Sequence, residues 1–252
     1  MLTMRDHGVD DYAVLPDMDA TDVGVLGEDD RACLDELGQY LAATDAWQRF
    51  GIWLLHKHFE PAPGEVFVER AIAAPRRTET TPLGRSAFPE QGLSTTAVRF
   101  GDSVDGDVAV IGMEFAEPAD FGDISPLSDD DEAVLAGIAE RLAAHGRTER
   151  FGVRLIRNPL GMSEQEMLHE TCDRAHRTLH CTVGERDELL TEKTIVQTAW
   201  RWRVVQGQTA PVVMQDCTAG CVRVAEGHDI DHKASGTDDF DDPVPGGPDL
   251  PS

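Results

Sequence analysis

An internal repeat is the feature of this sequence that most constrains its fold. The segment Leu26–Gly51, LGEDDRACLDELGQYLAATDAWQRFG, aligns without a gap to Leu127–Gly152, LSDDDEAVLAGIAERLAAHGRTERFG. The offset of 101 residues continues through Glu69 and Glu170, and it grows to 102 where TTAVRF aligns to QTAWRW. A register held over so long a stretch indicates that the chain contains two copies of one structural unit.

Each copy begins with helical spacing and continues with strand-like runs. The apolar residues recur every three or four positions, and acidic residues crowd the first turn, where the helix dipole favours them. Short loops such as EPAPG at 60–64 suit antiparallel hairpins. The predicted fold class is α+β: a tandem duplication of a helix plus antiparallel β-sheet unit, with the two copies in a pseudo-twofold arrangement. The helical positions are Leu34, Leu37 and Leu41 in the first copy and Leu135, Ile138 and Leu142 in the second.

The repeat sets the expected domain boundaries. The first α+β repeat covers residues 26–115, and the second covers 127–232 and ends in a cluster of Cys and His. Residues 1–25 are acidic and poor in large apolar side chains, which predicts a flexible N-terminal segment. Residues 233–252 are acidic and rich in Pro and Gly, which predicts a disordered tail.

Charge and composition exclude several classes of partner. The formal net charge is -25 among 252 residues, so the clustered cations that bind nucleic acid or an anionic membrane are missing. No signal peptide or apolar run of spanning length is present, so we expect a cytoplasmic protein whose five cysteines are thiols or metal ligands. The expected partner is a small-molecule substrate or ligand, and the choice between a monomer and a homodimer stays open.

His56 and His58 are the first candidate site. In a strand over 51–59, residues Ile52, Leu54, His56 and His58 share a face, and the two histidines are about 7 Å apart at a rise of roughly 3.3 Å per residue. Two imidazoles at that spacing can converge on one metal ion. The second copy has Arg157 and Pro159 at these positions. This contrast favours a function of the first copy over two histidines in the core, which is the alternative.

Two glutamates complete the predicted catalytic group. If the hairpin turn lies at 60–63, Glu65 opposes His58, and Glu69 lies on the same face. Glu65 and Glu69 are then candidates for a third ligand, an orienting group or a general base. A register shift of one residue would turn both carboxylates away from the histidines.

The sequence CTAGCVRVAEGHDIDH is the second candidate site. Cys217, Cys221, His228 and His232 offer the donor types of a tetrahedral zinc, and their compact spacing predicts a structural zinc site. Two alternatives remain open. The cysteines can form part of a single site with His56 and His58, or they can be buried thiols next to histidines in a solvated tail.

A weaker cluster lies in LHETCDRAHRTLHC, where His169, His176 or His180 is a candidate to complete the His56 and His58 site. Together these patterns predict a metalloenzyme with a divalent ion, zinc first and iron or copper as alternatives, acting on a small molecule. A metal-dependent hydrolase or lyase and an oxidoreductase are equally compatible with two imidazoles. The alternative from another class is a non-catalytic ligand-binding or assembly protein with a structural zinc only.

Overall fold

The computed structural model describes residues 2–18, 23–89, 92–102, 108–120, 125–191, 195–206 and 211–222. Within these ranges strands are the main elements, and four α-helices and three short 3-10 helices accompany them. The elements in chain order are β1 (Leu2–Asp6), α1 (Val9–Ala13), α2 (Glu28–Ala43), β2 (Phe50–Leu54), β3 (Glu65–Ile72), β4 (Arg77–Gly84), η1 (Arg85–Ala87), β5 (Ser94–Asp102), β6 (Val108–Ala116), η2 (Pro118–Asp120), η3 (Asp129–Asp131), α3 (Glu132–Ala144), β7 (Phe151–Leu155), β8 (Glu166–Asp173), β9 (Thr178–Glu185), α4 (Arg186–Thr191), β10 (Ile195–Gln206) and β11 (Pro211–Val222).

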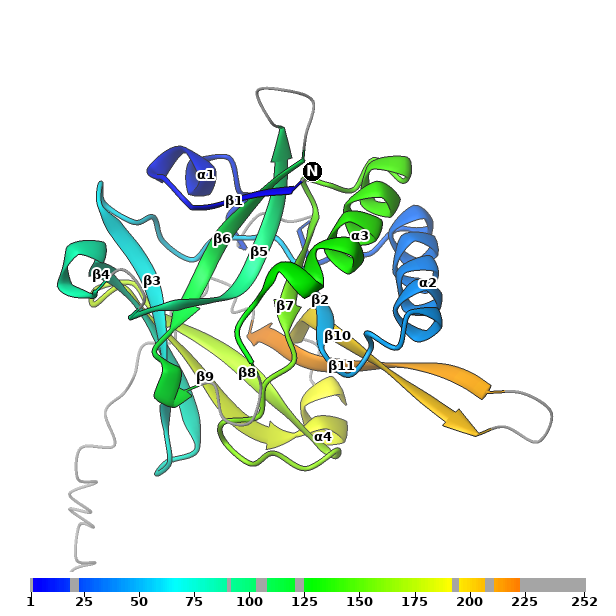
Figure 1. The fold of residues 1–252 in the computed structure, drawn as a ribbon. Helices are drawn as coiled ribbons and strands as arrows, with labels where there is room; N and C mark the ends of the chain where they lie inside the picture. The colour runs from blue at the N-terminus through cyan, green and yellow to red at the C-terminus, as the bar shows by residue number, and fades with distance from the viewer. Residues whose placement is uncertain are drawn as a thin grey trace, which may run out of the picture.

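All eleven strands belong to one sheet, in the order β1-β6-β3-β4-β9-β8-β11-β10-β2-β7-β5. Strand β5 also pairs with β6, so ten of the strands close into a barrel, and β1 pairs with the first half of β6, ahead of the part that pairs with β3. Figure 1 shows this closed sheet with α2 and α3 lying together on one side of it. Closure leaves the ten barrel strands with a hydrogen-bonded neighbour on both sides.

The predicted α+β fold with two separate helix-plus-sheet units is wrong, because the protein is mostly β and has one closed sheet. Strand β2 pairs with β7 and β10 of the other half of the chain, and β4 pairs with β9. The hairpin expected between β2 and β3 does not form, since β3 pairs with β4 and β6. In a separate unit, strands such as β2 and β4 would be exposed at an edge of the sheet. Here strands of the other half pair with them.

Corresponding positions of the two halves have corresponding pairings within the barrel. Ile52 opposes Val153 where β2 meets β7, and Glu79 opposes His180 where β4 meets β9. The parallel pairing of β3 with β6 has a counterpart in the pairing of β8 with β11. In these pairings Glu69 lies beside Ala116, and Glu170 lies beside Cys221. The two glutamates therefore occupy equivalent places inside one barrel.

Helices α2 and α3 cover the outer face of strands β2, β5, β7 and β10. Leu34, Leu37 and Leu41 are buried at the helical spacing seen in the sequence, and they pack in one core with Ile52 and Leu54. The acidic first turn also has a structural function, because Asp30 binds the backbone N–H of Gly27 and caps α2. Since side chains of a strand alternate, Trp53 between Ile52 and Leu54 points to the barrel interior, in a second core.

The N-terminal segment, expected to be flexible, instead contributes to the barrel. Strand β1 pairs in parallel with β6, and Tyr12, Leu15 and Met18 are buried. Residues 16–18 hydrogen-bond to the backbone of Lys57, which lies between the two candidate histidines. The predicted tail at 233–252 lies outside the described residues. Among those described, no helix is long and apolar enough to cross a membrane.

Candidate metal centre

His56 and His58 follow the end of β2 and point into the barrel. They do not share the face of Ile52 and Leu54 as predicted, because β2 ends at Leu54 and the strand alternation stops there. The backbone N–H of Lys57 then donates to the carbonyl of Pro16, and the Met18 N–H donates to the carbonyl of Lys57. These bonds fix the short segment whose two imidazoles are 6 % and 8 % exposed.

Two strands of the other half bring a carboxylate and a thiol to the same place. Glu170 on β8 and Cys221 on β11 are partners in the parallel register of these strands. Across the described residues, His56, His58, Glu170 and Cys221 are the one set of three or more His, Cys, Asp or Glu side chains that could hold a metal ion. All four residues are buried, and their ligand atoms lie within 4.8 Å of one another.

The distances between donors agree with the shell of a tetrahedral ion. The two Nε2 atoms of His56 and His58 are 3.1 Å apart, and they lie 3.4 and 3.7 Å from the Cys221 Sγ. The His56 Nε2 is 3.7 Å from the Glu170 Oε2. Zinc bonds of about 2.1 Å to nitrogen and about 2.3 Å to sulfur place neighbouring donors about 3.3–3.6 Å apart. The separations among His56, His58 and Cys221, and that from His56 to Glu170, therefore match those of ligands around one ion to within a few tenths of an ångström. Cys221 and Glu170 are closer than two ligands of one ion, because without an ion the thiol is hydrogen-bonded to the carboxylate.

Neighbouring groups set the protonation of the donors. The His56 Nδ1 lies 2.8 Å from the Leu54 carbonyl, to which it donates, so Nε2 of the neutral ring keeps its lone pair for a ligand. The Thr198 hydroxyl donates to the Glu170 Oε2 at 3.2 Å. Burial, together with the charge of Glu170, raises the pKa of Cys221 well above its usual value. Without an ion, Cys221 is therefore a thiol that donates to Glu170.

The equivalent place in the other half of the barrel already holds a cation. Glu69 corresponds to Glu170, and the Arg157 Nη2 lies 2.6 Å from its Oε1. Arg157 stands at the position that corresponds to His56, while Ala116 is the neighbour of Glu69 in the place of Cys221. One of the two equivalent buried carboxylates thus binds a guanidinium, and the other faces two imidazoles and a thiol.

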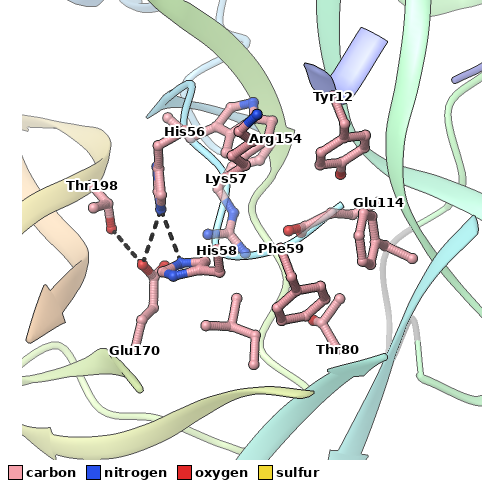
Figure 2. Close-up of a pocket in the computed structure, with 13 residues that line it drawn as sticks. Tyr12, His56, Lys57, His58, Phe59, Thr80, Glu114, Arg154, Glu170 and Thr198 are labelled. Atoms are coloured by element: carbon pink, nitrogen blue, oxygen red, sulfur yellow. Dashed lines mark hydrogen bonds and ion pairs between the residues drawn. The ribbon is translucent and has the colours of Figure 1, made fainter. Parts of the chain in front are cut away.

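A cavity of about 40 Å³ adjoins the cluster. His56, His58 and Glu170 line one side of it, and Glu114 and Tyr12 lie on the opposite side in Figure 2. Cys221 does not line this cavity, so its thiol reaches the other three donors from the side away from the cavity. A second cavity of about 90 Å³ lies next to Arg157 and Glu69. The first cavity gives a small ligand direct access to three of the four donors.

The two glutamates predicted to be catalytic lie elsewhere. Glu65 opposes Gly84 in the β3–β4 hairpin, and its carboxylate is 2.6 Å from the Arg177 guanidinium. The hydrogen bond from Arg177 and a weaker one from the Ala62 N–H hold the pKa of Glu65 below its usual value, against the opposite effect of partial burial. Glu69 faces the interior but is bound to Arg157. The structure therefore brings neither of them to the histidines.

The four residues predicted to form a structural zinc site do not form one cluster among the described residues. Cys221 joins His56 and His58, which was one of the open alternatives, whereas the buried Cys217 donates to the Ala219 carbonyl at 3.2 Å. His228 and His232 lie outside the described residues. His176 binds Asp173 and His180 lies 3.3 Å from Glu79, and neither they nor His169 belong to the cluster.

Glu170 is the ligand candidate that the sequence analysis did not select. Two signals were present: Glu170 corresponds to Glu69 in the repeat, and it alternates with His169 along one strand, so that only one of the pair can face inward. The pair Glu114 and Arg154, which lines the cavity, carries no recognisable spacing in the sequence.

No family model, curated protein or solved structure matches this chain.

Proposed function

We propose that this protein is a metalloprotein that binds one divalent ion, zinc in the first place, at His56, His58, Glu170 and Cys221. The observation that carries the proposal is the convergence of these four donors, from three separate segments, inside a barrel. Nitrogen and sulfur donors at tetrahedral separations favour zinc over the oxygen-binding ions magnesium and calcium.

The comparison with the other half of the barrel supports a cation at this place. A buried carboxylate needs a partner of opposite charge, and Arg157 provides it for Glu69. No Arg or Lys side chain makes a hydrogen bond or ion pair with Glu170 in the described part of the chain, where its direct partners are Thr198, Cys221 and His56. The charge of Arg154 also acts on Glu170, but Arg154 is shared with Glu114 and Glu69. A divalent ion would neutralise Glu170 and the Cys221 thiolate together.

The ion would act on a small molecule that enters the adjoining cavity. Three of its ligands line that cavity, so a bound water or substrate can reach the ion from this side. If His56, His58 and Cys221 are the ligands, Glu170 lies within reach of a bound water and can accept its proton, which is the arrangement that metal-assisted hydrolysis requires.

A closed structural zinc site is the second candidate. Four protein donors are sufficient to complete a tetrahedral shell, and such a site leaves no position for substrate. Cobalt substitution distinguishes the two, since cyanide changes the visible spectrum of the cobalt protein only when a coordination position is open.

The test of metal binding is elemental analysis of the full, untagged chain, together with the variants Cys221→Ser and Cys217→Ser. We expect one equivalent of metal in the wild type and in Cys217→Ser, because Cys217 is equally buried but bonds to a backbone carbonyl. Cys221→Ser and the double variant His56→Ala/His58→Ala are expected to lose it. A wild-type protein that contains no stoichiometric metal, and takes none up, would refute the proposal.

A further inference from the structure

We propose that the ligand of the cavity beside the cluster is a small carboxylate, held by the guanidinium of Arg154. This inference rests on the proposed function, because the metal ion is the other group that the ligand would meet there. Arg154 lies on β7 at the position that corresponds to Trp53, and it lines both the 40 Å³ and the 90 Å³ cavity.

Arg154 has no hydrogen-bond acceptor among the described residues. The neighbouring arginines that face the barrel are all bonded: Arg157 donates to Glu69 and to the Asp120 carbonyl, and Arg99 donates to the Asp11 carbonyl. A guanidinium carries five N–H donors, and those of the partly buried Arg154 are available to a ligand in the two cavities that this residue lines. The acceptor expected at Arg154 is therefore a group that enters the cavity.

The charges inside the barrel leave Arg154 available for an anion. Arg157 neutralises Glu69, and the proposed ion neutralises Glu170 and the Cys221 thiolate. Glu114 remains near Arg154 but makes no hydrogen bond to it in the described structure. Burial raises the pKa of Glu114 to about 7, so near neutral pH a large fraction of this carboxyl is protonated.

The shape of the cavity limits the rest of the ligand. Its volume of about 40 Å³ is a few times that needed for one water molecule, and Trp53, Phe59 and Phe67 form apolar walls. A carboxylate can accept two parallel bonds from a guanidinium, and a short hydrocarbon part fits aromatic walls. Lys57 also lines the cavity, but its ammonium already donates to the Ala13 carbonyl and to Glu60.

Calorimetric titration of acetate into the zinc-loaded full chain tests the inference. The variant is Arg154→Met, and the matched control is Lys57→Gln, which removes the other cation of the cavity. We expect acetate to bind the wild type and Lys57→Gln within a few-fold of each other, and Arg154→Met about 10- to 100-fold more weakly. Arg154→Lys, which retains the charge without the planar fork, should be intermediate. Acetamide, a neutral molecule of the same size, should bind wild type more weakly than acetate.

Zinc content and the melting temperature of every variant separate the two proposals. Equal acetate affinity in wild type and in a folded, zinc-loaded Arg154→Met variant would overturn the inference while metal binding stands. Equal affinity for acetate and acetamide, or no acetate binding by the loaded wild type, would overturn it as well. If no zinc binds, the proposed function fails, and the same titration of the metal-free chains then decides whether Arg154 alone holds the anion.

Discussion

The two equivalent glutamates should respond in opposite ways when each is changed to the neutral amide. In Glu69→Gln, Arg157 loses the carboxylate that neutralises it. Both side chains are almost completely buried, with exposures of 7 % for Glu69 and 4 % for Arg157. Breaking a buried ion pair by neutralising one partner costs about 3–5 kcal/mol, even though Arg157 keeps its bond to the Asp120 carbonyl. For a chain of this size that corresponds to a fall in melting temperature of about 6–20 °C. Metal content should not change, because neither residue belongs to the cluster.

Glu170→Gln should do the reverse. Without metal, Glu170 accepts hydrogen bonds from Thr198 and Cys221, and no Arg or Lys of the described structure hydrogen-bonds to it. The amide oxygen can still accept, so the metal-free variant should lose only about 1 kcal/mol. Loss of an outer-shell partner typically lowers metal affinity by about 10- to 100-fold. Because Glu170 is itself a proposed ligand, its replacement should lower the affinity for zinc by more than that.

Thermal unfolding by circular dichroism, in chelator and in excess zinc, measures both effects, and competition with a chelating dye gives the zinc affinity. Zinc should raise the melting temperature of wild type and Glu69→Gln much more than that of Glu170→Gln, since an ion stabilises only the state that binds it. The reasoning is refuted if the two variants have equal stabilities without metal and equal zinc affinities.

Three further predictions follow from the same contacts. Thr198→Val removes a hydroxyl bonded to Glu170 and should weaken zinc binding about 10-fold, whereas the equally buried Thr96→Val, at the corresponding position, should leave dye competition unchanged. Hydrogen bonds from Arg76, then from the Ser163 N–H, lower the pKa of Glu166 from 4.5 to about 2, so its contribution to stability is complete above pH 4.5 and is lost as the pH falls towards 2. Acid unfolding of Glu166→Gln should therefore depend less on pH over this range. Deletion of residues 1–18 removes the bonds to Lys57 and should lower zinc affinity, and a deletion variant with wild-type affinity would show that this segment does not position the histidines.

The local elements could be predicted because they depend on residues close in sequence. Helical spacing and acidic first turns located α2 and α3. The closure of the sheet could not be predicted, because the pairing of β2 with β7 joins residues about a hundred positions apart. Antiparallel hairpins between neighbouring strands are the default expectation, and β2 departs from it.

Only the part of the candidate site at which the two copies of the repeat differ could be predicted from the sequence. His56 and His58 differ from Arg157 and Pro159, and this difference singled them out without any knowledge of the fold. The third and fourth donors, Glu170 and Cys221, depend on the parallel pairing of β8 with β11. That pairing is not encoded in any spacing, and it requires β11 to continue as far as Val222 so that Cys221 lies beside Glu170.

The paired glutamates explain why the two halves could diverge at this place without loss of the barrel. A carboxylate fixed on the inner face of β3 or β8 requires positive charge, and one arginine or one divalent ion can supply it. A guanidinium whose N–H donors are hydrogen-bonded to protein acceptors has no position left for a further ligand. An ion held by protein donors on one side can still accept a ligand from the cavity. The same scaffold position thus gives a structural ion pair in one half and, in the other half, the proposed metal centre beside a cavity.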